Sequence, residues 1–159
     1  MIEARDVGKI PPDEVRFLKG QTRTMSTGYL RMYLDFCWNA RIKYDKQDFF
    51  CDVITDKNRM GSLNCWCIVQ DLLYKNDEYL DFGIWTPKAK RGKGHASRML
   101  EWVGERYKDK KLAVWPSNID VSPYLYRKFD RPPYYAFDGE KWKNDGSTYE
   151  RFDFSKLEQ

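Results

Sequence analysis

A basic loop with two glycines is the part of the sequence best suited to chemistry. It reads Arg91-Gly92-Lys93-Gly94-His95-Ala96 and stands between a strand-like segment, Glu78 to Trp85, and a helix-like segment that runs to Tyr107. The first turn of a helix exposes unpaired backbone N–H groups at the positive end of the helix dipole. Glycines let a ligand approach the backbone closely. The loop is therefore a candidate binding site for phosphate groups.

Positive charge is concentrated at the same place. The chain holds 28 Lys and Arg residues against 24 Asp and Glu residues, for a net charge of +4. Five of the cations lie between Lys88 and Arg98, a stretch without acidic residues, so the rest of the chain is slightly negative. A compact basic patch suits a small polyphosphate ligand better than a nucleic acid, which usually meets a spread stripe of Lys and Arg.

The loop taken alone also fits an ordinary tight turn with a solvated basic rim, because a single G-x-G is a weak motif. Two common phosphate-loop patterns do not fit. The G-x-x-x-x-G-K-[ST] pattern needs a longer loop and a Gly-Lys-Ser/Thr run that the chain lacks. The dinucleotide pattern G-x-G-x-x-G needs glycine where Ser97 stands.

The loop does resemble the central motif of the GNAT superfamily of N-acetyltransferases, R/Q-x-x-G-x-G/A, which Arg91 to Ala96 matches in full. The pair Met99-Leu100 follows, as is common on the family's helix. Two later segments, Leu112 to Asn118 and Leu125 to Phe129, look like the second family block, a strand ending near an Asn and a helix carrying Leu-Tyr. The resemblance covers Glu78 to about Phe129 and consists of two blocks in the family's order.

The second block also departs from the family pattern. The separation from Asn118 to Tyr126 is one residue longer than usual, and Pro123 interrupts the run between them. Ala113 stands where some protein-acetylating relatives carry a glutamate, which removes one candidate for the catalytic base. We therefore expect a shifted start of the helix that carries Tyr126.

The resemblance implies that acetyl-CoA is the co-substrate and that no metal takes part. The pyrophosphate would lie on backbone N–H groups of Lys93, Gly94, His95 and Ala96, with Arg91 and Gly92 shaping the approach. The pantetheine arm would lie beside Ile84 and Trp85, whose backbone could also stabilise an oxyanion. His95 occupies the variable position of the motif, nearer the phosphates than the thioester. Asn118 is either a cofactor contact or a turn residue after Pro116-Ser117.

The resemblance also suggests which residues transfer protons in the reaction. Tyr126, in its Leu-Tyr context, is the candidate acid for the leaving sulfur, with Tyr124 in reserve and a plain core tyrosine as the alternative. Glu78 and Asp81 are candidate bases. They are three residues apart on one strand, so alternation puts them on opposite faces and at most one can face a cleft. Either could instead be an exposed residue at a strand edge, and the base could be a chain of waters.

The expected acceptor is an amine of unknown identity, either a protein lysine or N-terminus or a small amine. In this family the first two helices and the last strands form the acceptor wall. Aromatic rings with carboxylates suit a cation there, although the same residues could simply be core. A catalytically silent acyl-CoA-binding module is the main alternative, and a nucleic-acid binder is a distant third. The candidate wall residues are Tyr29, Tyr33, Asp35, Trp38, Tyr134, Tyr135 and Trp142.

Composition favours one globular domain over residues 1–159, with 42% hydrophobic and 16% aromatic residues. The apolar runs are short and the N-terminus lacks the form of a secretory signal, so we expect a cytoplasmic protein without a membrane segment. The oligomeric state is left open, with a dimer among the options. Cys65-Trp66-Cys67 lacks the spacing of a zinc site, and strand alternation puts both thiols on one face. We expect buried, unpaired cysteines.

The order of the expected elements predicts an α/β fold, with a mixed central sheet flanked by helices on both faces. Hydrophobic periodicity and turn residues mark each element. The helix after Ser26 or Thr27 carries an apolar face expected in the core. The last two strands are expected to pair. In order, the elements are a strand over Met1–Ala4, helices from Pro12 and from Ser26 or Thr27, strands Phe49–Thr55, Leu63–Asp71 and Glu78–Trp85, the helix from His95, a strand over Lys111–Trp115, a helix over Val121–Phe129, and strands Tyr134–Asp138 and Tyr149–Phe154.

Overall fold

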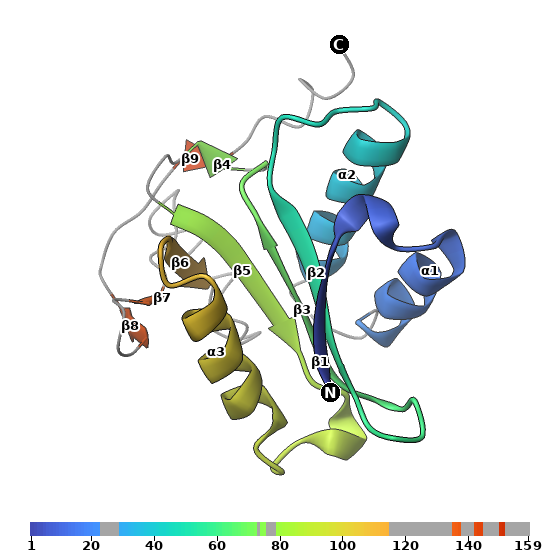
Figure 1. Cartoon of the computed structure of the whole chain (residues 1–159), viewed down its shortest axis with the longest axis vertical. Coiled ribbons are helices and arrows are strands. Elements are labelled where there is room, and N and C mark those ends of the chain that lie inside the picture. Colours follow the sequence, from blue (N-terminus) through green and yellow to red (C-terminus); the bar gives the residue numbers. More distant parts are fainter. Residues whose placement is uncertain are drawn as a thin grey trace.

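We describe a computed structural model of the chain at residues 1–22, 29–72, 74–75, 79–114, 135–137, 142–144 and 150–151. Three α-helices, two short 3-10 helices and nine strands lie in these ranges (Figure 1). No helix within them is both long and apolar enough to cross a membrane. The elements in order are β1 Ile2–Asp6, η1 Val7–Lys9, α1 Pro12–Gln21, α2 Tyr29–Ile42, β2 Cys51–Lys57, β3 Leu63–Gln70, β4 Tyr74–Lys75, β5 Tyr79–Trp85, η2 Lys88–Lys90, α3 His95–Arg106, β6 Lys111–Val114, β7 Tyr135–Phe137, β8 Trp142–Asn144 and β9 Glu150–Arg151.

The main sheet has seven strands in the order β1-β2-β3-β5-β6-β7-β8. Its neighbours are antiparallel except β5 and β6, which run parallel. A parallel pair needs a crossover connection, and here α3 provides it, crossing one face of the sheet (Figure 1). The predicted mixed sheet is confirmed.

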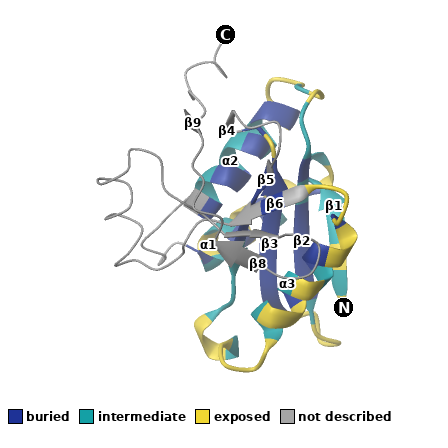
Figure 2. Cartoon of the chain, turned by 90° about the vertical axis from the view of Figure 1, so that its left-hand side faces the viewer, coloured by how far each residue is buried: buried dark blue, intermediate teal, exposed yellow. Residues whose placement is uncertain are grey.

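Helices cover both faces of this sheet, as predicted. All eight residues of β3 are buried, because its side chains alternate between two separate cores. Trp66 and Ile68 belong to the core under α1 and α2, whereas Cys65 and Cys67 belong to the core under α3. Figure 2 shows the buried residues concentrated in the central strands and on the helix faces that meet them.

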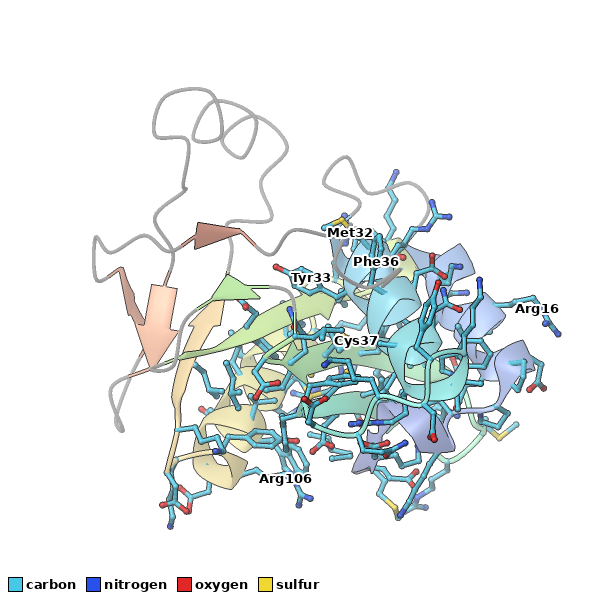
Figure 3. All side chains as sticks on the ribbon, turned by 90° about the horizontal axis from the view of Figure 1, so that it is seen from above. Arg16, Met32, Tyr33, Phe36, Cys37 and Arg106 are labelled. Atoms are coloured by element: carbon cyan, nitrogen blue, oxygen red, sulfur yellow. The ribbon has the colours of Figure 1, made fainter. Side chains whose placement is uncertain are left out.

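The apolar face predicted for α2 is core. Tyr33, Cys37 and Ala40 are fully buried, and Met32 and Phe36 pack against the same cluster. In Figure 3, Arg16 projects outward from α1 and Cys37 lies on the side of α2 that meets the strands. The helix begins at Tyr29 in the described part of the chain, and its predicted start at Ser26 or Thr27 lies outside that part.

A buried arginine fixes the end of α2 to the sheet. The guanidinium of Arg41 donates to Asp6 Oδ1 at 3.0 Å, to the carbonyl of Lys46 at 2.7 Å and to that of Phe49 at 2.9 Å. It also lies 4.0 Å from the centre of the Phe49 ring. Charge-assisted hydrogen bonds of this kind are roughly twice as strong as neutral ones, so Arg41 holds three segments in one place.

The predicted pairing of the last strands was wrong. The strand predicted at Tyr134–Asp138 is β7, but the strand that pairs with it is β8, which was not predicted. The strand predicted at Tyr149–Phe154 is the two-residue β9, which pairs with β4 in a second, small sheet. Strands of two or three residues carry too few side chains to show alternation, and their pairing is long-range.

Helix α2 approaches the sheet closely at Gly83 on β5. A methyl group built on Gly83 would lie 2.9 Å from Leu30 Cδ1 and 3.7 Å from Tyr33 Cδ2. Both of these side chains are buried. Only a residue without a side chain lets the helix settle onto the strand at this distance.

We therefore expect Gly83→Val to destabilise the fold by about 1–3 kcal/mol, because the added side chain overpacks the core under α2. Urea unfolding would measure the loss. The matched control is Gly20→Ala in α1, where a methyl group would meet nothing within 4 Å and should raise stability by about 0.5–1 kcal/mol. Equal midpoints for Gly83→Val and the wild type would show that α2 is not held this tightly.

Candidate functional site

Within the described residues, the pairing of β5 with β3 continues further along the strand than its pairing with β6. Its pairing with β3 runs as far as Trp85, which stands opposite Trp66. Its described pairing with β6 ends at Phe82, opposite Val114. Along a strand, backbone N–H and C=O groups point alternately to either side. Within the described residues, the stretch Gly83 to Trp85 therefore turns backbone groups toward the β6 side without a ladder partner there.

The basic loop follows directly from this end of β5. It passes through η2 and reaches Gly92 and Gly94, whose φ angles of 77° and 82° are in the left-handed region that favours glycine. Gly94 is the N-cap of α3, and no side chain caps the helix there. The first N–H groups of α3 are thus available to a ligand, at the positive end of the helix dipole.

Arg91 is held against the end of β5. Its Nε donates to the carbonyl of Thr86 at 3.0 Å, and its guanidinium lies 4.5 Å from the centre of the Trp85 ring. The Thr86 hydroxyl donates to Cys65 Sγ at 3.6 Å, which ties this turn to β3. The supporting roles of Trp85 and Thr86 were not predicted, because an aromatic residue six positions before an arginine is no recognised pattern.

His95 and Arg98 form a pair on the first turn of α3. Arg98 Nη2 lies 2.7 Å from His95 Nδ1, and its Nη1 donates to the carbonyl of Lys93 at 3.3 Å. Burial lowers the pKa of His95, and the positive charge of Arg98 lowers it further. Neutral His95 can accept a hydrogen bond from Arg98 at Nδ1, which protonated His95 cannot.

The body of α3 is anchored well away from the loop. Met99, Val103 and Tyr107 pack into the core beneath the helix. The Tyr107 hydroxyl donates to Asp52 Oδ2 on β2 at 2.7 Å, and burial together with this carboxylate raises the pKa of Tyr107. Both ends of the loop are therefore held in place, one by the end of β5 and the other by the anchored helix α3.

Of the candidate proton donors and bases, only Asp81 lies within the described residues. Asp81 is 2% exposed and stands opposite Gln70, on the face of β5 that meets α2, so the alternative of an exposed strand-edge residue was wrong for Asp81. Glu78, Asn118, Tyr124 and Tyr126 lie outside the described residues, and the roles assigned to them stay predictions.

Three of the predicted acceptor-wall residues serve the fold. Tyr33 is fully buried, Asp35 accepts from Lys19 Nζ at 2.7 Å, and Trp38 Nε1 donates to the carbonyl of Ile10 at 3.0 Å. The alternative of a core residue is correct for Tyr33. Asp35 is about half exposed and Trp38 is partly buried, and their place in an acceptor wall stays a prediction. The side chains of Tyr29, Tyr135 and Trp142, and all of Tyr134, lie outside what the structure describes.

The cysteines are buried and unpaired, as predicted. Cys37, Cys51, Cys65 and Cys67 are all free thiols. Burial raises the pKa of Cys65 to about 11 and that of Cys67 well above its ordinary value. Among the described residues there is no cluster of His, Cys, Asp and Glu that could hold a metal ion.

Solved structures described as acetyltransferases share this fold. A protein of Exiguobacterium sp. 255-15, provisionally described as an acetyltransferase, aligns with a TM-score of 0.52 and 10% identity over 99% of this chain and 95% of that one. A provisionally described phosphinothricin N-acetyltransferase aligns with a TM-score of 0.50 and 14% identity over 95% of this chain and 94% of its own. Mutant forms of a spermidine/spermine N-acetyltransferase from Vibrio cholerae align with a TM-score of 0.50 and 14% identity over 84% of this chain and 81% of theirs.

Sequence comparison adds no relative to these structures. No protein-family model matches the chain, and no curated protein matches its sequence. The likeness to the solved structures, at 10–14% identity, is a likeness of fold.

The pairing on α3 makes a prediction for the only histidine of the chain. The pKa of His95, followed by NMR titration, should lie below the usual value of about 6.5. Arg98→Met should raise it, because the neighbouring positive charge is removed. The control is Arg106→Met at the far end of α3, which should leave the pKa unchanged. A His95 pKa that does not respond to Arg98→Met would rule out the pairing.

Proposed function

We propose that this chain, which has the GNAT fold, is an acetyl-CoA-dependent N-acetyltransferase that passes the acetyl group directly to a primary amine. One observation carries the proposal. Strand β5, whose described pairing with β6 reaches Phe82, leads into a basic, glycine-containing loop that opens an uncapped helix. The two features together suit a long ligand with a polyphosphate at one end and an amide-rich arm at the other.

The loop fits the anionic end of acetyl-CoA. Lys93, Gly94, His95 and Ala96 would offer backbone N–H groups to the pyrophosphate. A side chain at Gly92 or Gly94 would need a strained left-handed backbone. Arg91, held by Thr86 and Trp85, would bring a fixed positive charge to the same place. Fixing the cation in advance lowers the entropy lost on binding.

The end of β5 fits the arm and the thioester. The arm would lie beside Ile84 and Trp85 as an added strand, using the backbone groups that face the β6 side. The amine nitrogen then attacks the thioester carbon, a C–N bond forms, the C–S bond breaks, and the carbonyl oxygen carries negative charge in the transition state. Backbone N–H groups near Ile84 and Trp85 would stabilise that charge without having to reorient.

Two protons must move in this reaction. The attacking amine loses one, and the sulfur gains one. We propose Tyr126 as the donor to sulfur, with Tyr124 in reserve, and Asn118 as a cofactor contact. Glu78 or a chain of waters is our choice for the base. Asp81, buried against α2, could serve only through a relay.

The acceptor we propose is a primary amine of a protein or a small molecule. Two of the compared enzymes are named for small amines, phosphinothricin and spermidine/spermine, which supports this class. The second candidate function is a silent acyl-CoA-binding module, favoured by the burial of Asp81, one of the two candidate carboxylates.

Acetyl-CoA and CoA should raise the melting temperature of the protein, and ATP should raise it less, because a ligand that binds only the native state stabilises it. Gly94→Asp should abolish the shift by placing a carboxylate in the anion site. The control is Gly61→Asp on the turn between β2 and β3, where the glycine has a similar φ of 80°, and it should keep the shift. The assignment would be contradicted if acetyl-CoA and CoA gave no shift in melting temperature, or a shift no larger than that given by ATP.

Thiol titration should detect amine-dependent release of CoA from acetyl-CoA. The rate should rise with pH, because only the neutral amine attacks and a lysine-like amine has a pKa of about 10.4. Tyr126→Phe should lower turnover roughly a hundredfold while acetyl-CoA affinity stays near that of the wild type. An unchanged rate would move the role to Tyr124 or to water.

A panel of lysine peptides, free N-termini, polyamines and aminoglycosides separates the two candidate functions. Acetyl-CoA binding without release of CoA by any amine, and without labelled acetyl transfer in a cell extract, would favour the silent module.

A further inference from the structure

The side chain of Arg98 folds back over the start of α3 and lies against three successive residues of the basic loop. Its Nη1 donates to the carbonyl of Lys93 at 3.3 Å, and its Nη2 lies 2.7 Å from His95 Nδ1. A methyl group built on Gly94 would lie 3.0 Å from the same Nη1. Long side chains on a helix point back toward its N-terminus, and this one ends on the turn that opens the helix.

The bond to Lys93 sets the direction of one backbone N–H group. The Lys93 carbonyl and the Gly94 N–H belong to the same peptide unit, and in a planar trans peptide these two groups point in opposite directions. Arg98 therefore turns the Gly94 N–H to the side away from its guanidinium. Glycine permits many backbone conformations, so a contact from outside the glycine is needed to keep this peptide in one of them.

Arginine-to-carbonyl hydrogen bonds hold both ends of the basic loop. Arg91 Nε donates to the carbonyl of Thr86 where the chain leaves β5, and Arg98 Nη1 donates to that of Lys93 where the chain enters α3. Gly92, with a φ of 77°, lies between them. A loop that is held at both ends loses less conformational entropy when a ligand binds.

The contacts of Arg98 require both an arginine and a neutral histidine. The planar guanidinium presents its donors in a rigid fork, so two of them can meet two acceptors in a fixed geometry, whereas lysine offers a compact charge on a flexible stem. His95 accepts at Nδ1 only when that nitrogen carries no proton.

The groups around His95 favour its neutral form. Burial lowers the pKa of His95, and so do the charges of Arg98 on the same helix and of Lys90 and Lys93 before it, while Asp56 on β2 opposes them. Histidine is the side chain that ordinarily changes its charge near neutral pH. The contact between His95 and Arg98 therefore forms at neutral pH and is lost in acid.

We propose that Arg98 is a positioning residue for the cofactor. Through Lys93 and His95 it holds the N–H groups of the loop in the arrangement that binds the pyrophosphate of acetyl-CoA. It acts through the backbone, and its own charge does not have to meet the phosphates. The inference rests on the proposed function and goes beyond it, because it names the residue that arranges the binding site and links cofactor affinity to the protonation of His95.

Calorimetric titration of the whole protein with acetyl-CoA tests this role. Arg98→Lys keeps the positive charge and loses the fork, so the Kd should rise roughly three- to tenfold, the scale of a hydrogen bond. The melting temperature of the free protein should stay the same, because Arg98 is exposed. Arg106→Lys, the same change at the last residue of α3, is the matched control and should leave the Kd unchanged. A wild-type Kd for Arg98→Lys would overturn the proposal, because charge alone would then suffice.

The pH dependence separates positioning from a direct effect of charge. The Kd of Arg98→Lys divided by that of the wild type should fall toward one as the pH drops below the pKa of His95, because the wild type then loses the contact as well. The charge gained by His95 acts on the ligand in both proteins and cancels in this ratio. A ratio that does not change with pH would overturn the proposal.

Replacing the histidine supplies a further control. In His95→Asn, Oδ1 stands as many bonds from Cα as Nδ1 does, and it accepts a hydrogen bond at any pH. The same ratio, measured in this background, should not change with pH. A ratio that still fell in acid would show that a group other than His95 is responsible and would overturn the link to His95.

Failure of this inference differs from failure of the proposed function. If the wild type does not bind acetyl-CoA, the proposed function and the role of Arg98 fall together. If the wild type binds acetyl-CoA and Arg98→Lys binds it equally well, only the role of Arg98 falls.

Discussion

The whole arrangement depends on β5 having an antiparallel neighbour on one side and a parallel neighbour on the other. A parallel neighbour cannot be reached by a tight turn, so the chain must leave the C-terminal end of β5 and return across a face of the sheet. The returning helix begins where β5 ends. The positive end of its dipole therefore lies at the edge of the sheet where β5 ends, and ligands usually bind beyond the carboxyl ends of parallel strands.

The same strand separates the two sides of the proposed reaction. Leu80 and Phe82 turn to the core under α3, whereas Gly83 lies directly against α2. Trp85 continues the second set and packs against the core on that side. A change of one residue in register would exchange the two sets and move every side chain to the opposite face. The contact of Leu30 with Gly83 opposes such a slip, because only glycine fits beneath it.

Local patterns in the sequence were enough for the loop, α3 and the central strands. Gly92 and Gly94 adopt the left-handed backbone, and the spacing of Met99 and Val103 placed one face of α3 in the core. Strand alternation predicted that the side chains of Glu78 and Asp81 lie on opposite faces of the sheet, but it could not say which face each occupies. Asp81 is buried in the structure. The small sheet of β4 and β9 was missed because it has two residues in each strand. The support of Arg91 by Trp85 depends on how a turn folds back, which no spacing encodes.

The burial of the thiols has a consequence for a protein that would hold an activated acyl group. Thioesters exchange readily with thiolates, so an ionised cysteine near the bound acyl group would take it and leave the protein S-acylated. Cys65 lies beside the turn that precedes the loop, where its sulfur accepts a hydrogen bond from Thr86. With a pKa of about 11 it stays protonated at neutral pH, and protonated thiols are poor nucleophiles. The same packing that fills the core under α3 thereby protects the chain from acylating itself.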